Sequence, residues 1–261
     1  MTATDGDVLR IESLAKRFGP VVALRDVTIH LRRGEVLGLI GDNGAGKSTL
    51  IKTLTGFLQP DSGAIFLDGE EVRLRSVAHA RQLGIETVYQ DLALIDELPV
   101  YLNMNLNKEQ VRRPFPFLDK KRMRAEARAK LDDMGVRIPS VDTEAAYLSG
   151  GQRQAIAIAR AVYSDAKILL LDEPLAAMGA KESRIILDLM NELKKRADLS
   201  MVMIAHNFAQ ITDVCDRVNL LQHGRITYDK IVAESSARDL TDLISAEYRF
   251  RGGSSTDQTG E

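Results

Sequence analysis

Residues 41–48 read GDNGAGKS, and this stretch restricts the possible folds of the chain more than any other. It matches the phosphate-binding loop (P-loop) G-x-x-x-x-G-K-[ST], which joins a buried strand to the start of a helix. An apolar run over residues 35–40 precedes it, and a helix is predicted over residues 48–55. Glycines let the backbone approach a polyphosphate closely, and the helix start adds free N–H groups and a favourable dipole. We therefore expect an α/β fold with a phosphate site at this loop.

Two side chains of the P-loop have distinct predicted roles. Lys47 supplies a positive charge for the β- and γ-phosphates, and the hydroxyl of Ser48 is predicted to bind Mg²⁺. The predicted phosphate-site residues are Gly41, Asp42, Asn43, Gly44, Ala45, Gly46, Lys47, Ser48 and Thr49.

Composition excludes several classes of protein. The 261 residues are 44% hydrophobic and 28% charged, with a net charge of -2, which gives no electrostatic case for binding nucleic acid or anionic lipid directly. A single cysteine excludes a disulfide framework and favours a reducing compartment. Residues 1–7 are polar, unlike a signal peptide, and no apolar run approaches the roughly 18 residues that span a bilayer. Any membrane role is therefore expected to come through a partner.

Strand and helix patterns alternate along the chain, and residues 92–147 read as helical rather than strand-rich. Predicted strands cover residues 8–14, 24–31, 64–67, 71–74, 85–89, 167–172, 201–205, 217–222 and 225–228. Predicted helices cover residues 118–134, 181–195 and about 236–248. We predict one domain over residues 1–250, with a core at about 8–91 and 164–235, a helical subdomain at about 92–163 and a disordered tail at 251–261.

A second motif is an apolar strand that ends in two carboxylates, Asp172 and Glu173. A carboxylate at the carboxyl end of a strand next to a P-loop strand is suited to hold Mg²⁺. Asp172 is predicted to act on the metal, through its water shell, and Glu173 to orient or deprotonate the attacking water. A buried strand with a solvated acidic end would give the same letters, and the P-loop upstream favours the functional interpretation.

The third motif, Leu148-Ser149-Gly150-Gly151-Gln152, precedes a helical run of small residues. With the P-loop and the Asp-Glu strand end in the same order, it makes residues 8–247 resemble the ATP-binding cassette (ABC) ATPases. The resemblance implies a P-loop NTPase (RecA-like) core with an N-terminal antiparallel β subdomain and an inserted α-helical signature subdomain. It also implies that the signature turn closes on an ATP molecule held by a second subunit, so that two copies hold two ATP molecules between them.

The resemblance assigns further residues singly. Gln90, after the strand at 85–89, matches the glutamine that reaches Mg²⁺ and the water. His206, after the strand at 201–205, matches the histidine that contacts the γ-phosphate, and Phe18 matches the aromatic that stacks on adenine. The predicted catalytic residues are Glu173, His206 and Gln90, and the predicted metal ligands are Ser48, Gln90 and Asp172.

Two features depart from simple expectations. Gly179 stands where the family commonly has an aspartate that reaches across the dimer, and Leu175 replaces a hydroxyl residue, so communication between the two sites is in question. The basic run that begins at Lys120 alternates with acidic residues around an amphipathic helix and has no aromatic platform, which favours a solvated face over a nucleic-acid site.

Several phrases, including residues 87–94 and 176–183, resemble the ATPases of monosaccharide (ribose, xylose and fructose) importers. The resemblance implies ATP hydrolysis with Mg²⁺, a second ATPase subunit, a multi-spanning permease, an extracytoplasmic binding protein as an indirect partner, and a peripheral position at the cytoplasmic face of the membrane. A non-transport cassette ATPase acting on ribosomes or DNA and a regulatory subunit with little turnover remain alternatives. The sequence does not name the cargo.

Overall fold

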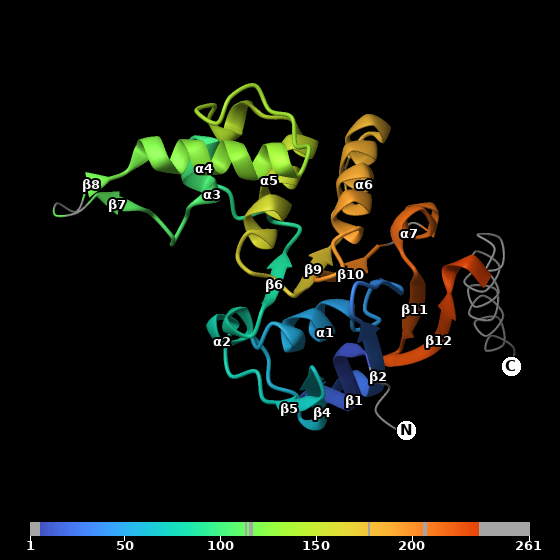
Figure 1. Ribbon diagram of the computed structural model, residues 1–261. Helices are drawn as coiled ribbons and strands as arrows, with labels where there is room; N and C mark the ends of the chain where they lie inside the picture. The colour runs from blue at the N-terminus through green and yellow to red at the C-terminus, as the bar shows by residue number, and fades with distance from the viewer. Residues whose placement is uncertain (1–5, 113, 115–116, 177, 206–207, 235–261) are drawn as a thin grey trace, which may run out of the picture.

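The computed structural model describes residues 6–112, 114, 117–176, 178–205 and 208–234. Two β-sheets lie side by side in it, and a group of helices extends from one end of the larger sheet (Figure 1). The predicted helix at 236–248 and the predicted tail at 251–261 lie outside the described residues. The one-domain division of the chain stays a prediction.

The smaller sheet is antiparallel and comes from the N-terminal quarter of the chain. Its strand order is β2-β1-β4-β5, formed by β1 (Asp7–Phe18), β2 (Val21–Arg32), β4 (Ser62–Leu67) and β5 (Glu70–Val72). The turn between β4 and β5 has positive φ at both Asp68 and Gly69, which suits the twist of a hairpin. The hairpin predicted at this pair is confirmed, while β1 extends further than the predicted strand at 8–14.

The larger sheet carries the chain segments predicted to bear the site. Its order is β12-β11-β3-β10-β9-β6, formed by β3 (Val36–Ile40), β6 (Ile85–Val88), β9 (Ile168–Asp172), β10 (Ser200–Ile204), β11 (Arg217–Gln222) and β12 (Arg225–Ile231). All neighbouring strands are parallel except β11 and β12. The carboxyl ends of β3, β10, β9 and β6 therefore meet at one edge, where α/β sheets bind ligands.

Two hydrophobic cores cover opposite faces of the larger sheet, as the alternation along β3 shows. Val36 and Ile40 pack with the helical side, whereas Leu37 and Leu39 pack with the smaller sheet and with α1 (Lys47–Leu54). α1 thus lies between the two sheets. The remaining helices of this part are α2 (Val77–Gln82), α6 (Ala180–Lys194), α7 (Phe208–Val214) and the short η2 (Val232–Glu234).

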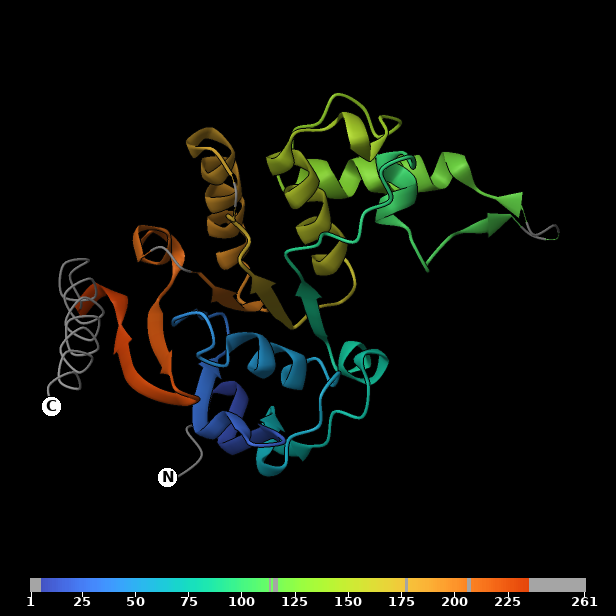
Figure 2. The same cartoon turned by 180° about the vertical axis from the view of Figure 1, so that it is seen from behind.

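The inserted helices lie between β6 and β9 in the sequence and project from the end of the larger sheet (Figure 2). They are α3 (Val100–Met104), α4 (Lys120–Asp133), η1 (Ala145–Tyr147) and α5 (Gly150–Val162). One short strand pair that the sequence patterns did not predict also lies in this mainly helical stretch, where β7 (Val111–Arg112) pairs with β8 (Phe117–Leu118). Each strand has two residues, too few to produce an alternating pattern in the sequence. The predicted α/β class with an antiparallel N-terminal sheet is confirmed.

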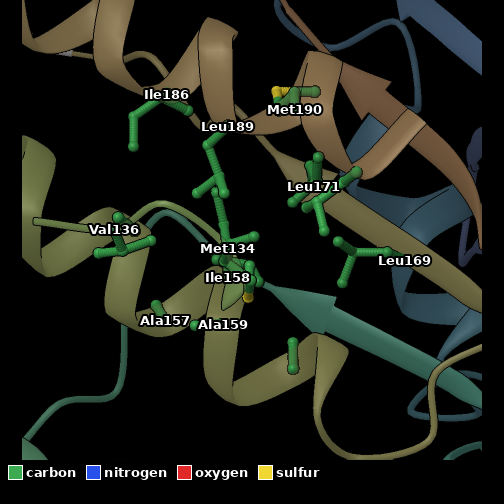
Figure 3. Close-up of a cluster of buried hydrophobic side chains, with 14 of the residues drawn as sticks. Met134, Val136, Ala157, Ile158, Ala159, Leu169, Leu171, Ile186, Leu189 and Met190 are labelled. Atoms are coloured by element: carbon green, nitrogen blue, oxygen red, sulfur yellow. The ribbon is translucent and has the colours of Figure 1, made fainter. Parts of the chain in front are cut away.

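Apolar side chains fix α5 against α6 and β9, as Figure 3 shows. Ile158 of α5 lies within one buried cluster with Ile186 and Met190 of α6, and each of the three is almost fully inaccessible to solvent. Burying such side chains contributes about 1.5–3 kcal/mol each. The start of α5 is therefore held at a fixed place beside the start of α6. Other members of the cluster labelled in the figure are Met134, Val136, Ala157, Ala159, Leu169, Leu171 and Leu189.

Candidate functional site

The P-loop runs from the end of β3 to the start of α1, as predicted from the strand and helix patterns. Gly44 and Gly46 have φ of 84° and 111°, a region that favours glycine. A Cβ atom on Gly46 would lie 2.5 Å from the carbonyl oxygen of Ala23 in β2, so the loop packs directly on the smaller sheet. Gly224 donates its N–H to Ala45 O at 3.0 Å and ties the loop to the β11–β12 turn. The loop is therefore held from two sides.

Lys47 is the charged centre of this loop and is only 6% exposed. Its Nζ donates hydrogen bonds to the carbonyl oxygens of Gly41 at 2.6 Å and Asp42 at 3.0 Å. Burial lowers the pKa of the Lys47 ammonium, and the carboxylates of Glu173, Asp42 and Asp172 oppose that shift. The start of α1 adds N–H groups that have no intrahelical partner. A buried ammonium, these N–H groups and the nearby carboxylates together suit an anion that is bound along with a cation.

Asp172 ends β9, and Glu173 follows it directly. In the sheet only β10 separates β9 from the P-loop strand β3, so both carboxylates share the edge of the P-loop. Both side chains are half-buried. Glu173 donates its backbone N–H to Ile204 O at 3.2 Å and has φ of 52°, a left-handed conformation that is uncommon for a residue with a side chain. Strain of this kind is concentrated at functional sites.

Gln90 lies just beyond β6, the strand next to β9, and its side chain is exposed. The loop that follows is attached to α5, because the Arg160 guanidinium donates to the carbonyl oxygens of Leu92 and Ala93, both at 2.8 Å. A shift of this loop would therefore be transmitted to the signature helix. The sequence reasoning missed Arg160, since an arginine on a helix gives no sign of its long-range partners. His206 lies outside the described residues.

The signature turn forms the start of α5, and its serine is the N-cap. Ser149 Oγ accepts the N–H of Gln152 at 3.3 Å, and Gln152 Oε1 accepts the N–H of Ser149 at 3.0 Å, which completes a capping box. Leu148 is buried in the helical core. A cavity of about 690 Å³ lies beside this turn. Its described lining residues come from residues 134–137, α5 and α6, so Ser149 faces a different space from the P-loop of the same chain.

The residues present suit a nucleotide with a divalent cation. Ser48 is exposed in the first turn of α1, and Asp172 shares its sheet edge, so a hydroxyl and a carboxylate are available together with phosphate oxygens. Mg²⁺ is commonly bound in this way rather than by a cage of protein ligands. Phe18, at the end of β1, is 46% exposed, and the ammonium of Lys16 lies 5.8 Å from its ring centre. An exposed ring face is what stacking on a purine requires.

Among the described residues, no group of three or more His, Cys, Asp and Glu side chains could hold a metal by itself. None of the helices within the described ranges is long and apolar enough to span a membrane.

Comparisons with known proteins agree with this geometry. The family model described as "ABC transporter" matches residues 24–176, more than half of the chain. The chain is 45% identical over 240 residues to the xylose/arabinose import ATP-binding protein of Sulfolobus acidocaldarius, covering 92% of this chain and 94% of that protein. It is 44% identical over 225 residues to the fructose import ATP-binding protein of Rhizobium meliloti, covering 84% and 86%.

Among solved structures, the chain resembles a nucleotide-free ATP-binding cassette from an ABC transporter, with a TM-score of 0.77 and 24% identity. The match covers 92% of this chain and 95% of that one, and it shows that the fold is shared. From the strand–loop–helix at the sheet edge, the capped glycine turn of α5 and these comparisons, we conclude that the chain belongs to the ABC transporter family.

Proposed function

We propose that this chain is the ATP-hydrolysing subunit of an importer that moves a monosaccharide through a membrane permease. The observation that carries the proposal is the shared sheet edge, where the P-loop after β3 and the Asp172–Glu173 pair after β9 are separated by one strand. The names of the relatives supply the sugar, since they are import proteins for xylose or arabinose and for fructose. The position we propose is peripheral, at the cytoplasmic face of the membrane.

In this proposal the P-loop of one copy holds the triphosphate. The amides of the loop and the ammonium of Lys47 bind its β- and γ-oxygens, and Phe18 stacks on the adenine. Ser48 and Asp172 would hold Mg²⁺, Asp172 through water, with Gln90 as a further ligand. When bound, the ion neutralises charge on the phosphates.

Glu173 is the proposed general base. It accepts a proton from water as the water oxygen bonds to the γ-phosphorus and the bond from phosphorus to the bridging oxygen breaks, so that ADP leaves with that electron pair. His206 is proposed to contact the γ-phosphate. This chemistry needs little from the protein beyond position and charge.

The second half of each site is proposed to come from a second copy of the chain. Ser149 lines a cavity to which no P-loop residue contributes, and we propose that its hydroxyl and the N–H groups at the start of α5 bind the γ-phosphate held by the other copy. Closure would move the helices between β6 and β9 and thereby act on the permease. A sugar-binding protein outside the membrane would deliver the cargo.

The central test compares the Glu173→Gln variant with wild-type protein. We expect phosphate release to fall by about 10²–10⁴-fold, the usual contribution of a general base, while ATP binding persists and dimers accumulate. Phosphate release and sedimentation with Mg²⁺ and ATP report the two effects. Glu70→Gln, in the distant strand β5, is the control. Normal turnover in the Glu173 variant would reject this residue as the base.

A further inference from the structure

Glu182 lies at the start of α6 beside the signature turn, and the proposed hydrolysis does not use it. Gly151 donates its N–H to Glu182 Oε1 at 3.5 Å. A Cβ atom placed on Gly150 would lie 3.6 Å and 3.8 Å from the two carboxylate oxygens, and one on Gly151 would lie 3.2 Å from Glu182 Cβ. The carboxylate therefore lies in contact with the turn, and a side chain on Gly151 would crowd Glu182 Cβ.

The positions of the two helices explain why an anion is favoured here. α5 begins at Gly150 and has no acidic residue in its first turn, while α6 begins at Ala180 and has Glu182 as its only acidic residue there. Gly179, the N-cap of α6, makes no side-chain cap. Both helix starts carry partial positive charge. Glu182 lies in the first turn of α6, and its carboxylate also contacts the start of α5.

The buried cluster of Figure 3 holds α5 and α6 in this arrangement. The contact between Glu182 and Gly151 can therefore change by rotation of the Glu182 side chain while the two helices stay in place. The adjoining cavity of about 690 Å³ is lined by Glu182 itself as well as by Ser149 and Gln152. Glu182 is half-buried. Its carboxylate consequently has space beside it into which it can rotate without disturbing the helix.

We propose that Glu182 is an internal anion that occupies the Gly150–Gly151 turn until the γ-phosphate of a second copy displaces it. The proposal rests on the function proposed above, in which this turn receives a phosphate. The Gly151 N–H that Glu182 accepts is also one that would bind the γ-phosphate, and two anions repel each other at one site, so the carboxylate competes with the nucleotide. A site that is free only a tenth of the time binds about tenfold more weakly than an open one. Glu182 thus sets the ATP concentration at which two copies close.

The test measures the ATP midpoint of dimer formation by sedimentation, in a Glu173→Gln background that retains ATP. Adding Glu182→Gln should lower the midpoint about tenfold, which corresponds to about 1.4 kcal/mol. Glu182→Asp should lower it as well, because the shorter side chain keeps the charge at the start of α6 but withdraws from Gly151. The difference in midpoint between Glu182→Gln and the background should shrink at high salt, which screens exposed charges.

The control is Glu192→Gln, which removes a carboxylate that lines the same cavity but pairs with Lys195 at 2.7 Å. Its ATP midpoint should equal that of the background. An unchanged or higher midpoint for Glu182→Gln would overturn the inference, as would a midpoint for Glu182→Asp equal to that of the background, which would reduce Glu182 to a helix-start charge. If the background itself forms no dimer with ATP, the proposed function fails first.

Discussion

Replacing Gly46 by alanine tests whether the P-loop is held by steric contact with the smaller sheet. The added Cβ would lie 2.5 Å from Ala23 O and 3.0 Å from Leu24 Cδ2, and φ at this position is 111°. Gly44→Ala is the matched variant, since φ is 84° there and no atom of the described residues lies within 4 Å of an added Cβ. Both variants incur backbone strain, but only Gly46→Ala also forces the loop away from β2.

Backbone strain alone costs about 1–2 kcal/mol. The contact with Ala23 adds overpacking of about 1–3 kcal/mol, so that Gly46→Ala should cost about 2–5 kcal/mol in total. At about 2.1 cal/mol/K per residue, the 261 residues give an unfolding entropy of about 0.55 kcal/mol/K. The Tm should therefore fall by about 2–4 °C for Gly44→Ala and by about 4–9 °C for Gly46→Ala.

Calorimetry without nucleotide measures both Tm values, and titration with a fluorescent ATP analogue measures binding. We expect Gly46→Ala to bind the analogue at least about tenfold more weakly, because displaced amides no longer converge on the phosphates. Equal Tm values for the two variants, together with unimpaired binding by Gly46→Ala, would show that the loop is not positioned by β2.

Three further predictions concern buried charged or reactive groups. Arg217 bonds to Glu35 at 2.7 Å and to both oxygens of Asp229 at 2.9 Å. Arg217→Met leaves the buried Glu35 without this cation, so it should cost about 3–5 kcal/mol and lower the Tm by about 5–9 °C. A Tm within a degree or so of wild type would contradict this. Burial raises the pKa of the Cys215 thiol to about 12, so iodoacetamide should label the native protein negligibly and the denatured protein fully, as mass spectrometry would show. Burial lowers the pKa of the Lys47 ammonium, so as the pH rises Lys47 should lose its proton, and ATP affinity should fall, before the ordinary lysine pKa of 10.5 is reached. An affinity that stays constant up to pH 10.5 would refute the role of the ammonium.

Local patterns predicted the strands that carry the motifs because each strand has its own signal. The four buried residues that precede Asp172 and the glycines after Ile40 mark strand ends directly, and parallel order then brings those ends to one edge. The two-residue strands β7 and β8 have no such signal. Their pairing depends on the return of the chain to α4, which a local pattern does not contain.

Contacts between distant residues were likewise invisible in the sequence. Glu182 and Gly151 are 31 residues apart, and nothing in either neighbourhood indicates that they meet. Arg160 reaches Leu92 across 68 residues in the same way. Both contacts follow from how α5 packs, and that packing is decided by side-chain volumes in the buried cluster rather than by periodicity.

The left-handed backbone of Glu173 has a consequence for how this position can vary. Glycine adopts φ of 52° without a Cβ penalty, so thermodynamics alone would select glycine there, and a larger residue lowers the stability of the fold. In the function proposed above, Glu173 gives up part of this folding free energy because its carboxylate acts as the base. A glycine at this position would relieve the backbone strain but would remove the carboxylate beside the P-loop, so under the proposed function folding stability and hydrolysis favour different residues here.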